Sequence, residues 1–198
     1  MKRRRMLQAF KTAVDVGNYD DVPVLPRNVD PQVHISRNTV SQPFFLICSK
    51  DTVIAQLSGE SRLELRDSSV NSFAVHPGDN VYVPAGTPHR VTPLSEVVQL
   101  RYRPQEAGLE GVAWYCPGCD RELHRVEWDT TDTVSQQAWT DACTSFNGDD
   151  RLRRCSDCGA QHPLIDMAPF GTWPELAAAL DAELRAAHDK PATPAPAR

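Results

Sequence analysis

Short hydrophobic runs follow one another between residues 33 and 104, each bounded by polar or turn-forming residues. Runs of this length, rich in β-branched and aromatic residues, are typical of strands, and no stretch with helical spacing interrupts them. The sequence therefore predicts an all-β unit in this region. Its clearest runs are Phe44–Ile47, Val53–Ala55, Arg62–Leu65, Val81–Val83 and Val97–Tyr102.

Helical spacing is found on either side of this unit. The residues up to about Asn18 are predicted to form a short basic amphipathic helix with Leu7, Phe10 and Val14 on one side. We expect this helix to pack on the β unit or on a partner subunit. Three prolines between residues 22 and 31 then predict an extended segment that leads into the first strands.

Two further helices are predicted towards the end of the chain. One covers about residues 133–146, and the other begins near Trp173, with Pro174 in its first turn and leucines at helical spacing behind it. The final segment, Lys190–Arg198, is dominated by proline and alanine and is predicted to be disordered.

Composition narrows the class of protein. A chain of 198 residues with 40% hydrophobic content suffices for one compact domain with appendages. A formal net charge of −5 argues against a nucleic-acid surface, and no apolar run approaches the length needed to span a membrane. The basic start is not followed by the apolar core of a signal peptide, so we expect a cytoplasmic protein.

Four of the six cysteines form two C-x-x-C pairs. The pairs are Cys116 with Cys119 and Cys155 with Cys158, and a predicted helix separates them. In a reducing compartment this spacing indicates a tetrathiolate metal site rather than disulfides. Soft thiolates suit both iron and zinc, so the pattern predicts either ion.

A second motif lies at the centre of the β unit. Gly78 is followed by a strand pattern, then by Pro84-x-Gly86 and, three residues after that glycine, by His89. The glycines and the proline predict a strand that runs into a tight turn, after which His89 opens the next strand. This arrangement aims one imidazole towards the interior of the β unit.

The motif from Gly78 to His89 is similar to the second conserved motif of cupins, which are small double-sheet jelly-roll barrels. Together with the cysteine pairs, it makes residues 33–162 resemble bacterial 3-hydroxyanthranilate 3,4-dioxygenases. The resemblance implies a mainly β fold: a cupin jelly-roll barrel with a C-terminal rubredoxin-like four-cysteine knuckle and a terminal helix. The implied division is residues 1–31 as helix and lead-in, 32–104 as barrel, 105–170 as metal-binding extension and 171–198 as helix and tail. Further sequence segments that support this resemblance are Gln56–Gly59, Glu110–Cys116, Leu123–Glu127 and Arg154–Pro163.

The same resemblance implies that most of the family's active site is missing. Enzymes of this family hold a non-haem Fe(II) with two histidines and one glutamate. Only His89 matches this set, because the other two positions hold Leu46 and Thr52, and the alternative cupin histidine position holds Cys48. An ordinary 3-hydroxyanthranilate 3,4-dioxygenase is therefore not expected. The family's two substrate arginines and one supporting glutamate fall at Gln42, Pro93 and Leu100.

One histidine in an apolar barrel suits a haem better than a free ion, because the porphyrin already supplies four nitrogens. The favoured hypothesis is a haem-dependent oxidoreductase with His89 as catalytic axial ligand. Leu46, Leu100 and Cys48 would line the cofactor cavity. Its substrate would be a small amine or an amino-acid-like metabolite.

Two alternatives remain open. A non-haem iron or copper ion could be held by His89, Cys48 and, if the alignment contains a short insertion, His34. The second alternative is a non-catalytic cupin that binds a ligand or serves as a partner subunit. In each case we expect a homodimer, with the N-terminal segment and the barrel edges as pairing surfaces.

Overall fold

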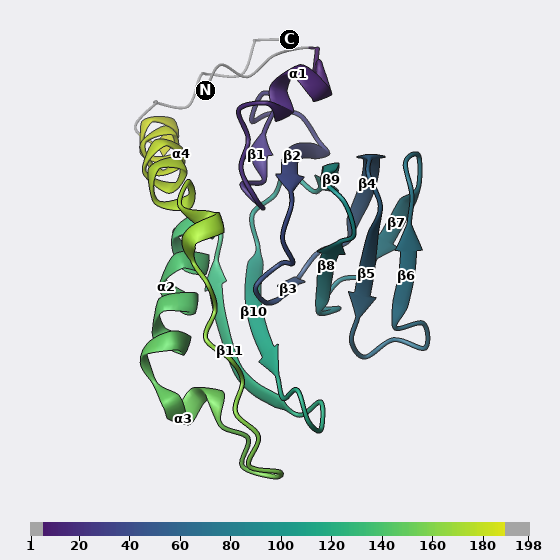
Figure 1. Cartoon of the computed structure of the whole chain (residues 1–198). Helices are drawn as coiled ribbons and strands as arrows, with labels where there is room; N and C mark the ends of the chain where they lie inside the picture. Colours follow the sequence, from purple (N-terminus) through teal and green to yellow (C-terminus); the bar gives the residue numbers. More distant parts are fainter. Residues whose placement is uncertain (1–5, 189–198) are drawn as a thin grey trace.

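Two antiparallel β-sheets face each other, and a layer of helices lies beside one of them (Figure 1). This arrangement is seen in a computed structural model that describes residues 6–188. The fold is mainly β, with a terminal helix, as the sequence predicted. No helix within the described residues has the length and apolar character that crossing a bilayer requires.

The five-stranded sheet has the order β1-β2-β9-β4-β7. β9 lies at its centre and pairs with β2 on one side and β4 on the other. Side chains alternate between the two faces along β9, which decides which residues reach the barrel interior. The strands are β1 Val22–Pro23, β2 Gln32–Asn38, β4 Thr52–Ser58, β7 Asn80–Val83 and β9 Val97–Arg103.

The six-stranded sheet has the order β11-β10-β3-β8-β5-β6. β10 and β11 come from the cysteine-rich part of the sequence, yet β10 pairs directly with β3 of the barrel. The first cysteine pair thus directly follows β10, a strand of the same sheet as β3. The strands are β3 Phe45–Cys48, β5 Ser61–Leu65, β6 Ser72–Val75, β8 His89–Pro93, β10 Leu109–Tyr115 and β11 Glu122–Asp129.

The helical layer covers the inner face of the six-stranded sheet at its β10–β11 end (Figure 1). Its helices are α2 Ser135–Gly148, α3 Asp150–Arg153, the 3-10 helix η1 Ala168–Phe170 and α4 Trp173–His188. The helices predicted near residues 133–146 and from Trp173 are both confirmed. The tail predicted from Lys190 lies outside the described residues.

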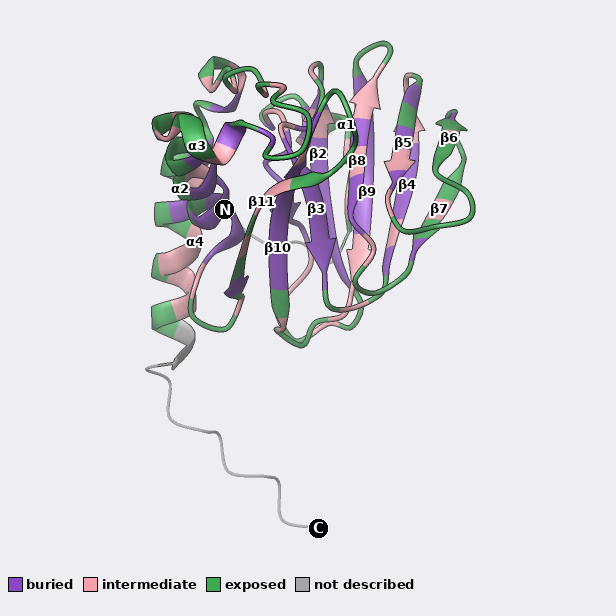
Figure 2. Cartoon of the chain, turned by 90° about the horizontal axis from the view of Figure 1, so that it is seen from below, coloured by how far each residue is buried: buried purple, intermediate pink, exposed green. Residues whose placement is uncertain are grey.

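The main core joins the barrel to the helical layer. Trp114 of β10 stacks on Phe146 of α2, with ring centroids 4.2 Å apart, and Trp139 of α2 lies 5.3 Å from Trp173 of α4. All four aromatic residues are at most 1% exposed. Figure 2 shows the resulting pattern, in which β3 and β10 are largely buried while most residues of the edge strands β6 and β7 are exposed or half-buried.

The N-terminal helix differs from its prediction. α1 covers only Ala9–Ala13 and turns Ala13 towards the five-stranded sheet, and Val16, which follows the helix, packs in the same cluster. Phe10 and Val14, which were expected on its packing side, are 60% and 66% exposed. The small side chain of Ala13 allows the close approach to the sheet, so the buried side of α1 is not its most hydrophobic one.

Candidate functional site

His89 lies at the start of β8 and is completely buried. The turn before it has the geometry that its sequence predicted, because Gly86 has a φ of 76° and donates its N–H to the carbonyl oxygen of Cys48 at 2.7 Å. Gly78, at the start of the motif, has a φ of 96°. The cross-strand partners of His89 are Leu65 and Leu46, and Leu46 is one of the positions that the resemblance assigned to a lost iron ligand.

Both ring nitrogens of His89 are engaged. Nη1 of Arg101 donates to Nε2 at 2.8 Å, and Nδ1 donates to the carbonyl oxygen of Thr87 at 3.1 Å. Because a guanidinium can only donate and a carbonyl can only accept, the ring is the neutral tautomer with its proton on Nδ1. Burial, together with the charge of Arg101, lowers the pKa of His89 to about 3. The lone pair of Nε2 is therefore occupied by Arg101.

Arg101 is held in this position by a buried ion pair. Its Nε lies 3.0 Å from Oδ2 of Asp21, and the two side chains are 7% and 4% exposed. A buried guanidinium needs a counter-charge, since desolvation of an unpaired ion is costly. Asp21, Arg101 and His89 thus form one chain of polar contacts inside the barrel.

The segment that delivers Asp21 is conformationally unusual. Tyr19 and Asp21 have φ values of 51° and 44°, a region that side chains other than glycine seldom adopt. Such backbone persists where surrounding contacts fix it. Here the Tyr19 amide donates to Oδ1 of Asn38 at 2.7 Å. The carboxylate of Asp20 accepts from Oγ1 of Thr172 at 2.6 Å. The lead-in is therefore fixed both to the barrel and to the helical layer.

A cavity of about 340 Å³ lies where β3 leads into β4 and β9 leads into β10. Leu180 and Leu184 of α4 cover one side of it. Arg27 ties the lead-in to the same helix, since its guanidinium lies 3.7 Å from Oε2 of Glu183. The polar residues that line it include Asp21, His34, Cys48, Thr52, Arg103 and Glu110.

Arg103 and Glu110 form a second ion pair on the cavity wall. Nη1 of Arg103 donates to Oε1 of Glu110, and Oγ of Ser135 donates to Oε2 of the same carboxylate at 2.8 Å. Cys48 is the cross-strand partner of Glu110 and is 7% exposed. Burial, followed by the nearby carboxylate of Glu110, raises the pKa of Cys48 to about 11. Cys48 therefore lies beside the cavity as a neutral thiol.

Leu100 and Arg101, which are neighbours in β9, lie on opposite faces of the five-stranded sheet. Leu100 belongs to a cluster with Ile35 and Ala55 that packs against α1, whereas its neighbour Arg101 reaches His89 on the opposite face. The residue beside His89 in β9 is thus Arg101 and not Leu100, because side chains alternate along a strand.

Sequence reasoning missed Asp21, Glu110 and Ser135 as partners of the buried groups around Arg101 and Arg103. The sequence did contain one indication that such acidic partners exist. Two arginines at alternate positions of a hydrophobic strand share one face, and burial of that face requires acidic partners. The spacing did not identify those partners, because Asp21 and Glu110 lie on other segments.

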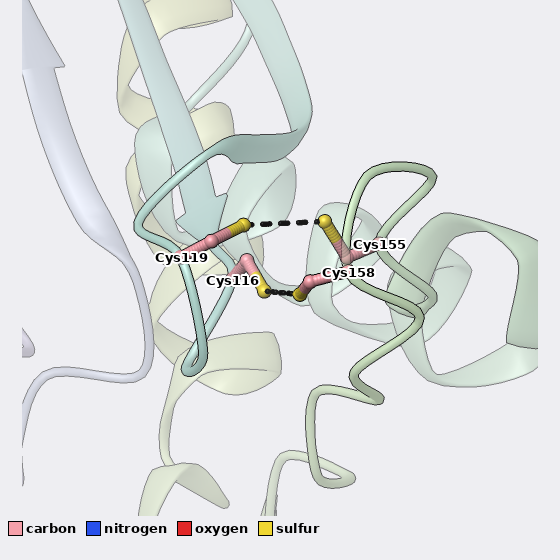
Figure 3. A group of neighbouring side chains, drawn as sticks. All are labelled: Cys116, Cys119, Cys155 and Cys158. Carbon is pink, nitrogen blue, oxygen red and sulfur yellow. Dashed lines mark hydrogen bonds between the residues drawn. The ribbon is translucent and has the colours of Figure 1, made fainter.

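The four predicted metal ligands do come together. Figure 3 shows the two pairs facing each other, with Sγ of Cys116 3.4 Å from Sγ of Cys158 and Sγ of Cys119 3.5 Å from Sγ of Cys155. All four sulfur atoms lie within 4.8 Å of one another. Zn–S bonds of about 2.3 Å would separate tetrahedral thiolates by roughly 3.8 Å, so the cluster fits a tetrahedral metal ion. Such an ion would join the end of β10 to the segment after α3.

The barrel interior does not fit a metal ion in the same way. Within residues 6–188, the cysteine cluster is the only group of three or more His, Cys, Asp or Glu side chains whose ligand atoms lie so close together. Next to His89, the structure places the carbon side chain of Leu46 and the cation of Arg101. A haem would need only one imidazole, but Nε2 of that imidazole already accepts from Arg101.

The fold and the cysteine cluster define a cupin-like barrel of two antiparallel sheets with four cysteines that could hold a metal ion. Comparison of the sequence with characterised proteins then gives its kinship. The chain is 32% identical to 3-hydroxyanthranilate 3,4-dioxygenase of Bacillus thuringiensis over 120 residues, covering 58% of this chain and 65% of that protein. The Brucella anthropi enzyme is 32% identical over 114 residues, covering 54% and 62%. The chain is thus a distant relative of these dioxygenases, which are oxidoreductases, and it spans less than two thirds of their length.

Other comparisons add little. No family model matches the chain. The hydroquinone 1,2-dioxygenase PnpCD is similar in structure with a TM-score of 0.43 and 17% identity, over 52% of this chain and 80% of that one. A cupin-2 domain protein of Shewanella frigidimarina also has a TM-score of 0.43, with 15% identity over 50% of this chain and 94% of that one.

Proposed function

We propose that this chain binds a small polar organic molecule in the cavity at the barrel end, and that its barrel works without a metal ion or haem on His89. The observation that carries the proposal is the contact of 2.8 Å between Arg101 and Nε2 of His89. A guanidinium remains protonated in proteins, so Arg101 keeps a positive charge where a metal ion would have to bind.

Removal of Arg101 from this place is energetically unfavourable. A metal ion on Nε2 would have to displace a guanidinium that also pairs with Asp21, and any movement that separated this pair would leave a carboxylate with 4% exposure without its counter-charge. Loss of one partner from a buried ion pair costs about 3–5 kcal/mol. The cavity lies beside this network and offers hydroxyl, thiol, amide and charged groups to a ligand.

The proposal is tested on protein produced with both iron and a haem precursor supplied. We expect metal only in the amount that the four cysteines bind, no Soret band, and saturable binding of a small molecule by calorimetry. A Soret band that disappears in His89→Ala would overturn the proposal. So would metal in excess of the cysteine site that the same substitution removes.

The kinship with dioxygenases favours a second candidate, an oxidoreductase that acts on a small amine or an amino-acid-like metabolite. Its cofactor would be a haem on His89, or iron or copper held by His89, Cys48 and His34. With either cofactor, the hydrogen bond from Arg101 to Nε2 of His89 would have to break. Turnover with a reductant and oxygen or peroxide, abolished in His89→Ala, would support this candidate over the first.

We also propose a homodimer, a cytoplasmic location, and iron or zinc at the four cysteines. Sedimentation of the metal-loaded protein tests the first, and cell fractionation tests the second. Elemental analysis identifies the ion. A monomer across micromolar to millimolar concentrations would contradict the dimer.

A further inference from the structure

The ion pair between Arg103 and Glu110 lies on the cavity wall and makes no direct contact with His89. Arg103 is at the end of β9 and Glu110 near the start of β10, and their side chains are 17% and 7% exposed. Ser135, at the start of α2, fixes the carboxylate through Oε2, which leaves Oε1 for Arg103. The pair is therefore positioned from three different elements.

Every charge on the cavity wall that could attract a ligand already has a partner of opposite sign. A ligand with a single charge would therefore be buried without compensation, which is unfavourable. A ligand with one positive and one negative group avoids this cost, because it can insert between two paired groups. Two pairs lie wholly on the wall, Arg103 with Glu110 and Lys50 with Glu106, and two wall residues pair with residues behind it, Asp21 with Arg101 and Arg27 with Glu183.

The wall between Arg103 and Glu110 is suited to such an insertion. The guanidinium of Arg103 can bind a ligand carboxylate with two parallel hydrogen bonds. A ligand ammonium group can then take the place of Arg103 at Oε1 of Glu110, while Ser135 keeps Oε2. All four charges remain paired in the complex. Apolar residues of the lining leave room for an apolar ligand side chain: Pro23, Pro104, Leu180 and Leu184.

We infer that the cavity takes a zwitterionic α-amino acid with an apolar side chain, its carboxylate on Arg103 and its ammonium group on Glu110. This inference rests on the proposed function of the cavity and names the class of its ligand. A cavity of this kind should prefer such a zwitterion to an aromatic carboxylate that lacks a cationic amine.

Calorimetric titration of the metal-loaded protein provides the test. The probes are L-phenylalanine and L-leucine, with 3-phenylpropanoate as the analogue that lacks the ammonium group and phenethylamine as the one that lacks the carboxylate. We expect at least one amino acid to bind about tenfold or more tightly than either analogue, since each analogue leaves a buried partner unpaired. 3-Hydroxyanthranilate is included as an anionic reference ligand.

Variants assign the effect to the two residues. The double variant Arg103→Met with Glu110→Gln removes both charges together, so it leaves no unpaired charge and is expected to fold. It should lose the preference for the zwitterion. The double variant Arg90→Met with Glu64→Gln removes an ion pair between β8 and β5 that does not line the cavity, with side-chain exposures of 34% and 28%, and should keep the preference.

The outcomes separate the two proposals. Equal or tighter binding of 3-phenylpropanoate or 3-hydroxyanthranilate would overturn the zwitterion and leave the cavity as a binding site. A zwitterion preference that survives in the Arg103 and Glu110 double variant would overturn the assignment to these residues. Absence of saturable binding by all five probes would count against the zwitterion and against the proposed function together.

Discussion

Arg101 donates a hydrogen bond of 2.8 Å to the buried Nε2 of His89, and Asp21 holds its guanidinium from the other side. His89 is the one iron-ligand position that the resemblance to the dioxygenases preserves. The barrel thus contains a fixed organic cation with its own counter-charge beside the histidine. This network accounts for how a histidine can be fully buried in the barrel without a metal ion beside it.

The Asp21–Arg101 pair should be strongly coupled in stability. Arg101→Met leaves the Asp21 carboxylate buried without a partner, and we expect a loss of about 3–5 kcal/mol in the free energy of unfolding. The double variant Asp21→Asn with Arg101→Met should lose markedly less. Urea unfolding of the metal-loaded proteins measures both values. Equal losses in the single and double variants would mean that the two charges do not interact.

His89 should make the protein sensitive to acid. Its folded pKa of about 3 lies below the ordinary value of 6.5, so the unfolded chain binds a proton first as the pH falls. The stability linked to neutral His89 is complete above pH 6.5 and is lost progressively as the pH falls towards 3. In this window the folding constant should fall by up to about tenfold per pH unit. His89→Gln, which can still accept from Arg101, should unfold with a shallower pH dependence; identical profiles would contradict the shift.

The cysteine cluster should bind one metal ion per chain. Cys116→Ser and Cys158→Ser should lower the bound metal and the stability, because each removes one of four ligands. Cys143→Ala is a matched control, since Cys143 is buried in α2 and lies outside the cluster. Elemental analysis and thermal unfolding measure the result. Full metal content in both serine variants would show that the cluster is not the metal site.

Cys48 should react slowly with alkylating reagents in the folded protein. Its pKa of about 11, raised mainly by burial, keeps the sulfur protonated at pH 8, and the thiolate is the reactive form. Mass spectrometry after iodoacetamide treatment at pH 8 should find little modification of Cys48 until the protein is unfolded by urea. Rapid labelling in the folded state would indicate a more open barrel end than the structure has.

Two glycines with positive φ provide a test of the barrel turns. A Cβ on Gly59 would lie 2.1 Å from the carbonyl oxygen of Glu96, whereas a Cβ on Gly78 would have no atom within 4 Å. Gly78→Ala should cost only the strain of its backbone conformation, about 1–3 kcal/mol. Gly59→Ala should cost clearly more, because backbone must also move. Thermal unfolding of the two variants compares them, and similar losses would contradict the close contact at Gly59.

Several features could be predicted because the physics that determines them is local. Alternating hydrophobic runs favour strands, and the turn at Gly86 requires a positive φ that glycine adopts easily. The helices near residues 135 and 173 were identified from their 3.6-residue periodicity. Two C-x-x-C pairs predicted a shared site, since each pair forms a compact turn that points both thiols the same way. The structure brings all four sulfur atoms together.

The environment of His89 was decided by the tertiary structure. Asp21, His89 and Arg101 lie on three separate segments, and no spacing in the sequence relates a carboxylate to the guanidinium that it will neutralise. The register of β9 selects Arg101 instead of Leu100 for the interior face, and a shift of one residue would reverse that choice. The sequence by itself determined the barrel, its turn and the cysteine cluster. Only strand pairing, and the need of each buried charge for a partner, decided that a guanidinium lies against the histidine.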